Sequence, residues 1–214
     1  MFGLAPEKLA LFALAALLLA ATPGPVWLYL ISRTLAQGRR AGYFSMFGVA
    51  AGLSLHVLLA AFGLTVVLMT IPFAFDAIKL AGAAYLLWLA WNTVRGCGMS
   101  FTPQPLAAAP DRVLLRQAFV AAAINPKVAV FYLSLFPQFV DPATGPVLAQ
   151  SLLLGSIQVA LAAIVDLTLV TVAGVLAAWF ARRPLWLRTQ RWFLGGAFGV
   201  LAVWLTLTPR QSAQ

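Results

Sequence analysis

Charged residues are scarce in this chain. Only 9% of its 214 residues are charged and just five are acidic, whereas 63% are hydrophobic. A soluble domain normally carries about 25% charged residues. The composition therefore excludes an ordinary soluble domain and indicates an integral membrane protein. The length leaves room for about six spans of roughly 20 residues with short loops, and for no appended soluble domain.

Cysteine and histidine are almost absent as well. The single cysteine, Cys97, excludes an internal disulfide and a two-thiol relay. The single histidine, His56, excludes a His-rich metal site. The sequence also contains no phosphate-binding loop and no nucleophile–base spacing. We therefore expect no cofactor, no metal site and no enzymatic activity.

Basic residues are in excess, and the net charge is +9. No basic run is long enough to indicate nucleic-acid binding. In membrane proteins, lysine and arginine accumulate in cytoplasmic loops. The expected partners are therefore the lipid bilayer and a small-molecule substrate, and not nucleic acid.

Long apolar runs predict an all-α membrane protein with six transmembrane helices. The expected spans cover residues 8–33, 43–69, 75–94, 113–140, 147–180 and 192–207. We expect a single membrane domain, 1–214, with a first half at 1–95, a cytoplasmic linker at 96–112 and a second half at 113–214. A cleaved signal peptide ending near Ala21 is an alternative. It is disfavoured because Glu7 and Lys8 cancel where a signal peptide needs positive charge.

The expected loops differ in charge. Lys8 and Arg210 are the basic residues on one side of the membrane. Ten basic residues fall in the connections on the other side: Arg33, Arg39, Arg40, Arg95, Arg112, Arg116, Arg182, Arg183, Arg188 and Arg191. By the positive-inside rule, these three connections are cytoplasmic and both termini are periplasmic or extracellular.

Two helix-breaking motifs interrupt the first and fourth expected spans. They are Thr22-Pro23-Gly24-Pro25 and Asn125-Pro126-Lys127. Proline removes a backbone donor where hydrocarbon demands unbroken hydrogen bonding. At 1.5 Å per residue, Pro23 lies about 22 Å from Lys8 and Pro126 about 15 Å from Arg116, so both breaks are expected near mid-membrane. Tolerated kinks are the alternative, because proline and glycine are common in membrane helices.

The spacing after the two motifs repeats. Pro23 precedes Gly42 by 19 residues, and Pro126 precedes Gly145 by 19. Three spans in each half force the halves to be inverted. Inverted repeats with interrupted helices near the midplane are a known transporter architecture. We therefore expect two inverted three-helix repeats, with helices 1 and 4 broken near the midplane.

Polar groups near the breaks form a candidate transport site. Half-helices that begin at Pro25 and Pro126 would offer free N–H groups to a carboxylate. Lys127 needs an anionic partner or a wet cleft at this depth, and Asp166 could hold a substrate ammonium, carry a proton or pair with Lys127. The expected substrate-binding residues are Thr22, Pro23, Gly24, Pro25, Asn125, Pro126, Lys127 and Asp166.

Two further features have alternative interpretations. His56 could relay protons, as could Asp166, or it could be a hydrogen-bonded packing residue. The small-residue segments 48–52 and 195–199 favour close helix packing, although a homodimer face is also possible.

Several of these motifs together resemble a known family. Thr22–Pro25, Gly38–Gly42 and Lys79–Leu89 resemble the first half of the LysE-type translocators, the bacterial lysine and threonine/homoserine-lactone exporters. Asn125–Lys127 followed by Phe136–Val140 is similar to the second-half signature, and the resemblance covers about residues 7–208. One departure is Val26 and Trp27, where members often have a polar asparagine, and it bears on the substrate more than on the fold.

The resemblance implies export of amino acids or related small zwitterions from the bacterial inner membrane, driven by proton exchange or the membrane potential. It carries the family signature onto Pro23, Gly24, Pro25, Asn125, Pro126 and Lys127, and it makes Asp166 similar to a family acid. A cation or metal exporter is one rival, although one histidine, one loop cysteine and one buried acid make a poor metal site. A non-transporting membrane scaffold is the second rival, and it leaves Lys127 and Asp166 unexplained.

Overall fold

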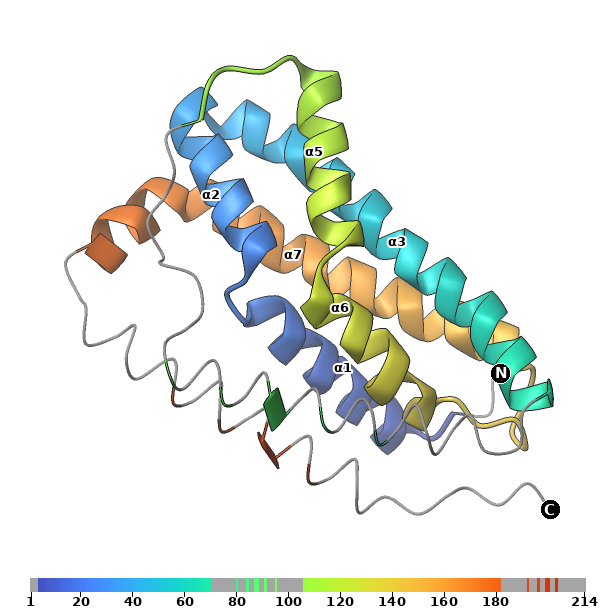
Figure 1. Ribbon diagram of the computed structural model, residues 1–214. Coiled ribbons are helices and arrows are strands. Elements are labelled where there is room, and N and C mark those ends of the chain that lie inside the picture. The colour runs from blue at the N-terminus through green and yellow to red at the C-terminus, as the bar shows by residue number, and fades with distance from the viewer. Residues whose placement is uncertain are drawn as a thin grey trace.

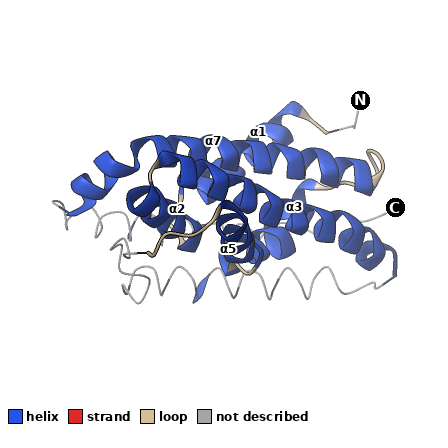
Figure 2. Ribbon diagram, turned by 90° about the horizontal axis from the view of Figure 1, so that it is seen from above, coloured by secondary structure: helices blue, strands red, loops and turns tan. Residues whose placement is uncertain are grey.

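The computed structural model describes residues 4–70 and 106–181, with single helical positions between 80 and 95 and between 192 and 203. Within these residues every regular element is helical (Figures 1 and 2). The expected third and sixth spans and most of the linker lie outside them. The elements are α1 (Pro6–Ala21), α2 (Pro25–Gln37), α3 (Arg39–Thr70), α5 (Asp111–Ala123), α6 (Pro126–Val130), the π-helix η1 (Phe131–Leu135), the 3₁₀ helix η2 (Phe136–Phe139) and α7 (Val147–Ala181).

Two long helices, α3 and α7, confirm the second and fifth expected spans. Their segments Arg39–Gly63 and Val147–Val175 are long and apolar enough to cross a membrane, with 25 and 29 residues. At 1.5 Å per residue these segments measure about 37 and 43 Å. Because the hydrocarbon core is about 30 Å thick, both helices must tilt or extend into the interface.

Both expected interruptions are present, and each one bends its span. α1 and α2 meet at 52°, and α5 meets the segment Pro126–Phe139 at 45°. α2 and α6 each begin with a proline, whose missing N–H costs nothing at the first helical position. When each bent pair counts as one span, the described residues contain up to four candidate spans.

The chain after the second break is less regular than the sequence pattern suggests. The five-residue α6 continues as a π-helix and then as a 3₁₀ helix. Pro137 lies in this last element and removes a donor from the helical ladder. The change in hydrogen-bonding period therefore has a local chemical cause.

The helices pack closely because glycines face their neighbours. α7 packs against α1, α2 and α3, while α3 packs along α5 (Figure 1). A side chain at Gly48 would clash with the carbonyl oxygen of Leu115. A Cβ at Gly52 would lie only 2.7 Å from the carbonyl oxygen of Phe119. The small-residue segment 48–52 thus has the packing role expected for it. Most of the segment 195–199 is outside the described residues.

An aromatic cluster joins the two broken spans away from their breaks. The Phe12 ring on α1 lies 5.9 Å from Phe131, 5.8 Å from Phe136 and 5.2 Å from Phe139, measured between ring centroids. Phe12 and Phe136 are fully buried. Tilted and edge-to-face contacts of this kind add to the stabilisation from burial. The cluster holds α1 against η1 and η2.

Candidate transport site at the two helix breaks

The break after α1 frees backbone carbonyls, because a helix cannot satisfy its own last four. The Thr22 N–H donates to the Leu18 carbonyl at 3.0 Å, and the Thr22 hydroxyl donates to the same oxygen. The Trp27 indole, in the first turn of α2, donates to the Ala20 carbonyl at 2.9 Å. Residues of the motif and its flank therefore satisfy part of the interrupted backbone, as a membrane span requires.

Lys127 supplies two further donors from the other broken span. Its Nζ atom donates to the Leu19 carbonyl and to the Thr22 carbonyl, both at 2.7 Å. A Cβ at Gly24 would lie 3.5 Å from Nζ, in van der Waals contact, so the motif backbone lies directly beside the ammonium group. Lys127 therefore joins the two breaks, although about a hundred residues separate them in the sequence.

The acceptors explain how the Lys127 charge is held. A lysine in the first turn of α6 faces the positive end of that helix, which disfavours a cation. The carbonyls of Leu19 and Thr22 are at the negative end of α1, which favours one. Backbone carbonyls are thus the direct contacts of this ammonium.

Asp166 on α7 carries the opposite charge near this site. The residue is 6% exposed and interacts electrostatically with Lys127. The two side chains form no direct ion pair, and no group within residues 4–70 and 106–181 hydrogen-bonds to the carboxylate. A buried carboxylate without donors is costly. The arrangement therefore leaves Asp166 available to a further group.

The two half-helix N-termini differ. Asn125 is 2% exposed, and its side chain accepts a hydrogen bond from the Lys127 N–H at 3.1 Å, which caps α6. Gly24 provides α2 with no side-chain cap. Among the described residues no group accepts a hydrogen bond from the Val26 or Trp27 N–H. The free donors at the breaks are therefore those of α2.

His56 lies at the second break rather than beside Lys127. Its Nε2 is 3.3 Å from the Ala122 carbonyl, near the end of α5, and a carbonyl can only accept. The imidazole stacks on Tyr132 at 5.7 Å, and the Tyr132 hydroxyl donates to the Gln158 amide oxygen at 2.8 Å. This polar chain connects α3, η1 and α7. Tyr132 and Gln158 were not predicted from the sequence, because neither belongs to a recognisable motif.

The structure corrects the expected position of Arg33. α2 continues to Gln37, so Arg33 lies inside a helix and not in the following loop. The residue is only 4% exposed. Its guanidinium donates to Gln37, to Gln117 and to the carbonyl of Ala107. The burial of Arg33 was not predicted, because Arg33 was grouped with Arg39 and Arg40 in the expected loop after the first span.

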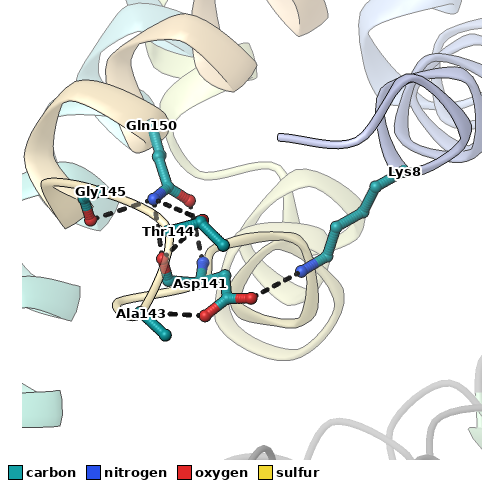
Figure 3. A network of polar contacts seen from close by, with 6 residues as sticks. All are labelled: Lys8, Asp141, Ala143, Thr144, Gly145 and Gln150. Atoms are coloured by element: carbon teal, nitrogen blue, oxygen red, sulfur yellow. Dashed lines mark hydrogen bonds and ion pairs between the residues drawn. The ribbon is translucent and has the colours of Figure 1, made fainter. Parts of the chain in front are cut away.

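A second polar cluster lies at the opposite end of α1 (Figure 3). Lys8 Nζ lies 3.9 Å from a carboxylate oxygen of Asp141. Gln150 is fully buried, and its side chain accepts from the Asp141 N–H at 2.9 Å and donates to the carbonyls of Asp141 and Gly145 at 2.8 and 3.0 Å. This cluster fixes the turn before α7 and connects it to the start of α1.

Comparisons with known proteins agree with these features. The chain is 34% identical over 169 residues to the homoserine/homoserine lactone efflux protein of Salmonella typhimurium, which covers 78% of this chain and 81% of the relative. It is 34% identical to an uncharacterised membrane protein of Pseudomonas aeruginosa, over 86% of this chain and 84% of the relative. The leucine efflux protein of an Enterobacter species is 29% identical, over 61% of this chain and 62% of the relative.

No solved structure matches the chain. The family described as LysE type translocator matches residues 17–208, which include both breaks, Lys127 and Asp166. That match and the apolar helices make this protein a membrane transporter that belongs to the LysE-type translocator family.

Proposed function

We propose that the protein is a secondary transporter that exports amino acids or related small zwitterions across the bacterial inner membrane. The names of the homoserine and leucine efflux relatives support this substrate class. The single observation that carries the proposal is the geometry of Lys127, which bridges the two helix breaks and interacts electrostatically with Asp166, a buried acid to which no described residue donates a hydrogen bond. In this proposal the protein has no enzymatic activity and needs no cofactor.

The proposed architecture is two inverted three-helix halves, 1–95 and 113–214, whose broken helices meet near the midplane. The 52° and 45° bends support it. Both termini are periplasmic and the linker 96–112 is cytoplasmic, because ten basic residues lie on the linker side and two on the other. A homodimer is compatible with this arrangement and is not needed for it.

The substrate carboxylate is proposed to bind between α2 and Lys127. The Val26 and Trp27 N–H groups begin α2, where the helix dipole favours an anion. An ammonium has three N–H donors, and Lys127 uses two of them on Leu19 and Thr22. The third donor remains for a carboxylate.

The substrate amino group is proposed to bind Asp166. The carboxylate of Asp166 is buried, and no described group donates to it, so an incoming ammonium would provide the missing donors. One cation and one acid match a molecule with one carboxylate and one amino group. The site therefore favours amino acids without net charge over dibasic or diacidic ones.

The motif residues have supporting roles in this proposal. Thr22 contributes its carbonyl to Lys127, and Gly24 lies beside the ammonium. Pro23, Pro25 and Pro126 interrupt or begin the half-helices, and Asn125 caps α6. Asp166 or His56 would take up the exchanged proton.

A transport assay tests the proposal. The purified protein would be reconstituted in liposomes that are loaded with leucine, homoserine, lysine or glutamate. Efflux of each amino acid would then be measured under an imposed voltage or pH difference. We expect efflux of leucine and homoserine well above that of lysine and glutamate. No efflux of any amino acid would contradict the proposal. In that case, efflux of divalent cations would favour the cation or metal exporter. If no divalent cation moved either, the non-transporting scaffold would be favoured.

A further inference from the structure

Arg33 is a buried cation that the site described above does not use. It lies eight residues after Pro25 on α2, about 12 Å along the helix from the break. In the proposed orientation this direction leads toward the cytoplasm. Arginine remains protonated in proteins, so the buried group carries its full charge.

The partners of Arg33 within residues 4–70 and 106–181 are neutral. Nη1 donates to the Gln37 amide oxygen at 2.9 Å and to the Ala107 carbonyl at 2.7 Å, and Nη2 donates to the Gln117 amide oxygen at 2.8 Å. No acid in this part of the chain forms an ion pair with it. The nearby Asp111 bonds Arg40 instead, at 3.1 Å. The guanidinium charge thus lacks a counter-ion there.

One edge of the guanidinium is incompletely used. Nε is buried and has no hydrogen-bond partner in the part of the chain that the structure describes. Nε and Nη2 present parallel N–H groups along the same edge, which is the geometry that binds a carboxylate with two hydrogen bonds. Among the described residues, only the amide oxygen of Gln117 accepts a hydrogen bond from this edge, through Nη2. The two oxygens of a carboxylate could accept from both Nε and Nη2.

Gln117 is placed so that it can leave this edge. The residue is exposed on α5. Its amide oxygen has one further donor, the Tyr29 hydroxyl at 3.5 Å, and that hydroxyl also donates to the Leu114 carbonyl at 3.1 Å. The Tyr29 ring lies 5.8 Å from the guanidinium carbon. Tyr29 and Arg33 therefore keep other contacts when Gln117 moves away.

The other edge of Arg33 is held by the chain that precedes α5. This segment runs from the start of α5 toward α2 (Figure 1). Gln37 exchanges two hydrogen bonds with the backbone of Ala109, both at 3.0 Å, and its oxygen also accepts from Arg33. The Ala107 carbonyl completes the contacts of Nη1. The guanidinium is thus held in one orientation by one edge while the other edge remains available.

We propose that the Nε–Nη2 edge of Arg33 is a docking site for the carboxylate of an amino acid on its way to the helix breaks, and that the carboxylate displaces Gln117. This inference rests on the proposed function. It adds a second binding position about two helical turns along α2 from Pro25. This position is on the proposed cytoplasmic side, from which an exporter must load its substrate. Lys127 and the α2 N-terminus would receive the same carboxylate next.

Substitutions at Gln117 test the docking site. Gln117→Glu places a permanent carboxylate on the free edge, so it should raise the KM for leucine about tenfold or more without lowering the thermal stability. Gln117→Ala removes the competing amide, so its KM should equal or fall below that of the wild type. Initial uptake rates in everted membrane vesicles report loading from the cytoplasmic face.

Two further variants separate docking from a purely structural role. Arg33→Lys keeps the charge and loses the paired donors, so its KM should also rise about tenfold. Arg40→Gln removes an exposed arginine that pairs with Asp111 and should keep the wild-type KM. Leucinol, which lacks the carboxylate, should inhibit wild type and Gln117→Glu equally.

The outcomes are distinguishable. A wild-type KM for both Gln117→Glu and Arg33→Lys, in vesicles that transport leucine, would overturn the docking site and leave the proposed function standing. Equal increases of KM in Gln117→Glu and Gln117→Ala would also overturn it. Vesicles of the wild type that transport no amino acid would overturn the proposed function, and the docking site with it.

Discussion

The ammonium of Lys127 donates a hydrogen bond of 2.7 Å to the backbone carbonyl of Leu19. The donor begins the second half of one broken span, and the acceptor lies at the end of the first half of the other. The positive charge is thereby satisfied by the negative end of a helix. The same contact couples the two breaks, so that movement of one affects the other.

Lys127→Met should damage both stability and transport. The apolar side chain leaves the Leu19 and Thr22 carbonyls without their donor. We expect the free energy of unfolding to fall by about 2–4 kcal/mol and leucine transport to be lost. Thermal unfolding in detergent and liposome efflux measure these effects. Lys127→Arg retains a cation and should unfold closer to wild type, whereas wild-type stability of Lys127→Met would refute the bridging role.

Gly52→Ala should loosen the packing of α3 on α5. The new Cβ would lie 2.7 Å from the Phe119 carbonyl oxygen, so a backbone must shift. A loss of about 1–3 kcal/mol in the free energy of unfolding is expected. Gly63→Ala is a matched control on the same helix, because no described residue lies within 4 Å of a Cβ placed there. Equal unfolding temperatures of the two variants would argue against close packing at Gly52.

Gln150→Ala should destabilise the turn before α7. Its buried amide holds the Asp141 N–H and the carbonyls of Asp141 and Gly145. Removing the amide should cost about 2–4 kcal/mol in unfolding free energy. The comparison is Lys8→Gln, which breaks a partly exposed contact of 3.9 Å and should cost less than about 1 kcal/mol. Chemical unfolding of both variants decides whether Gln150 or the ion pair holds this end.

His56→Phe should lower stability by about 1 kcal/mol, because the ring stays on Tyr132 while the Ala122 carbonyl loses the imidazole donor and keeps the Asn125 N–H. If His56 also carries the exchanged proton, the variant should lose efflux driven by a pH difference. It should retain exchange of leucine between the two sides, since exchange needs no net proton movement. If His56→Phe shows the same pH-driven efflux as the wild type, His56 is a packing residue and not a proton carrier.

The sequence was sufficient to predict the two breaks and the long spans α3 and α7. Proline has a fixed chemical effect on a helix, and the apolar runs are long. The acceptors of Lys127 could not be predicted, because the carbonyls of Leu19 and Thr22 look like those of any other residue. The burial of Arg33 was missed for a similar reason. Its partners include Gln117 and the Ala107 backbone, which only the packing of α2 against α5 brings close.

The roles of Lys127 and Asp166 in holding a zwitterion are the centre of this account. Leucine carries both charged groups, whereas 4-methylpentanoate carries the same carboxylate and side chain without the ammonium. Competition by each compound can be measured in liposomes with wild type and Asp166→Asn. The variant keeps the size of the side chain and removes the charge that would hold the ammonium.

The most direct test is therefore the inhibition constant of the two compounds in Asp166→Asn. The account predicts that leucine binds about tenfold or more weakly in the variant than in wild type, while 4-methylpentanoate binds about as well as before. Unchanged leucine binding, or an equal loss for both compounds, would contradict the assignment of Asp166 to the substrate amino group.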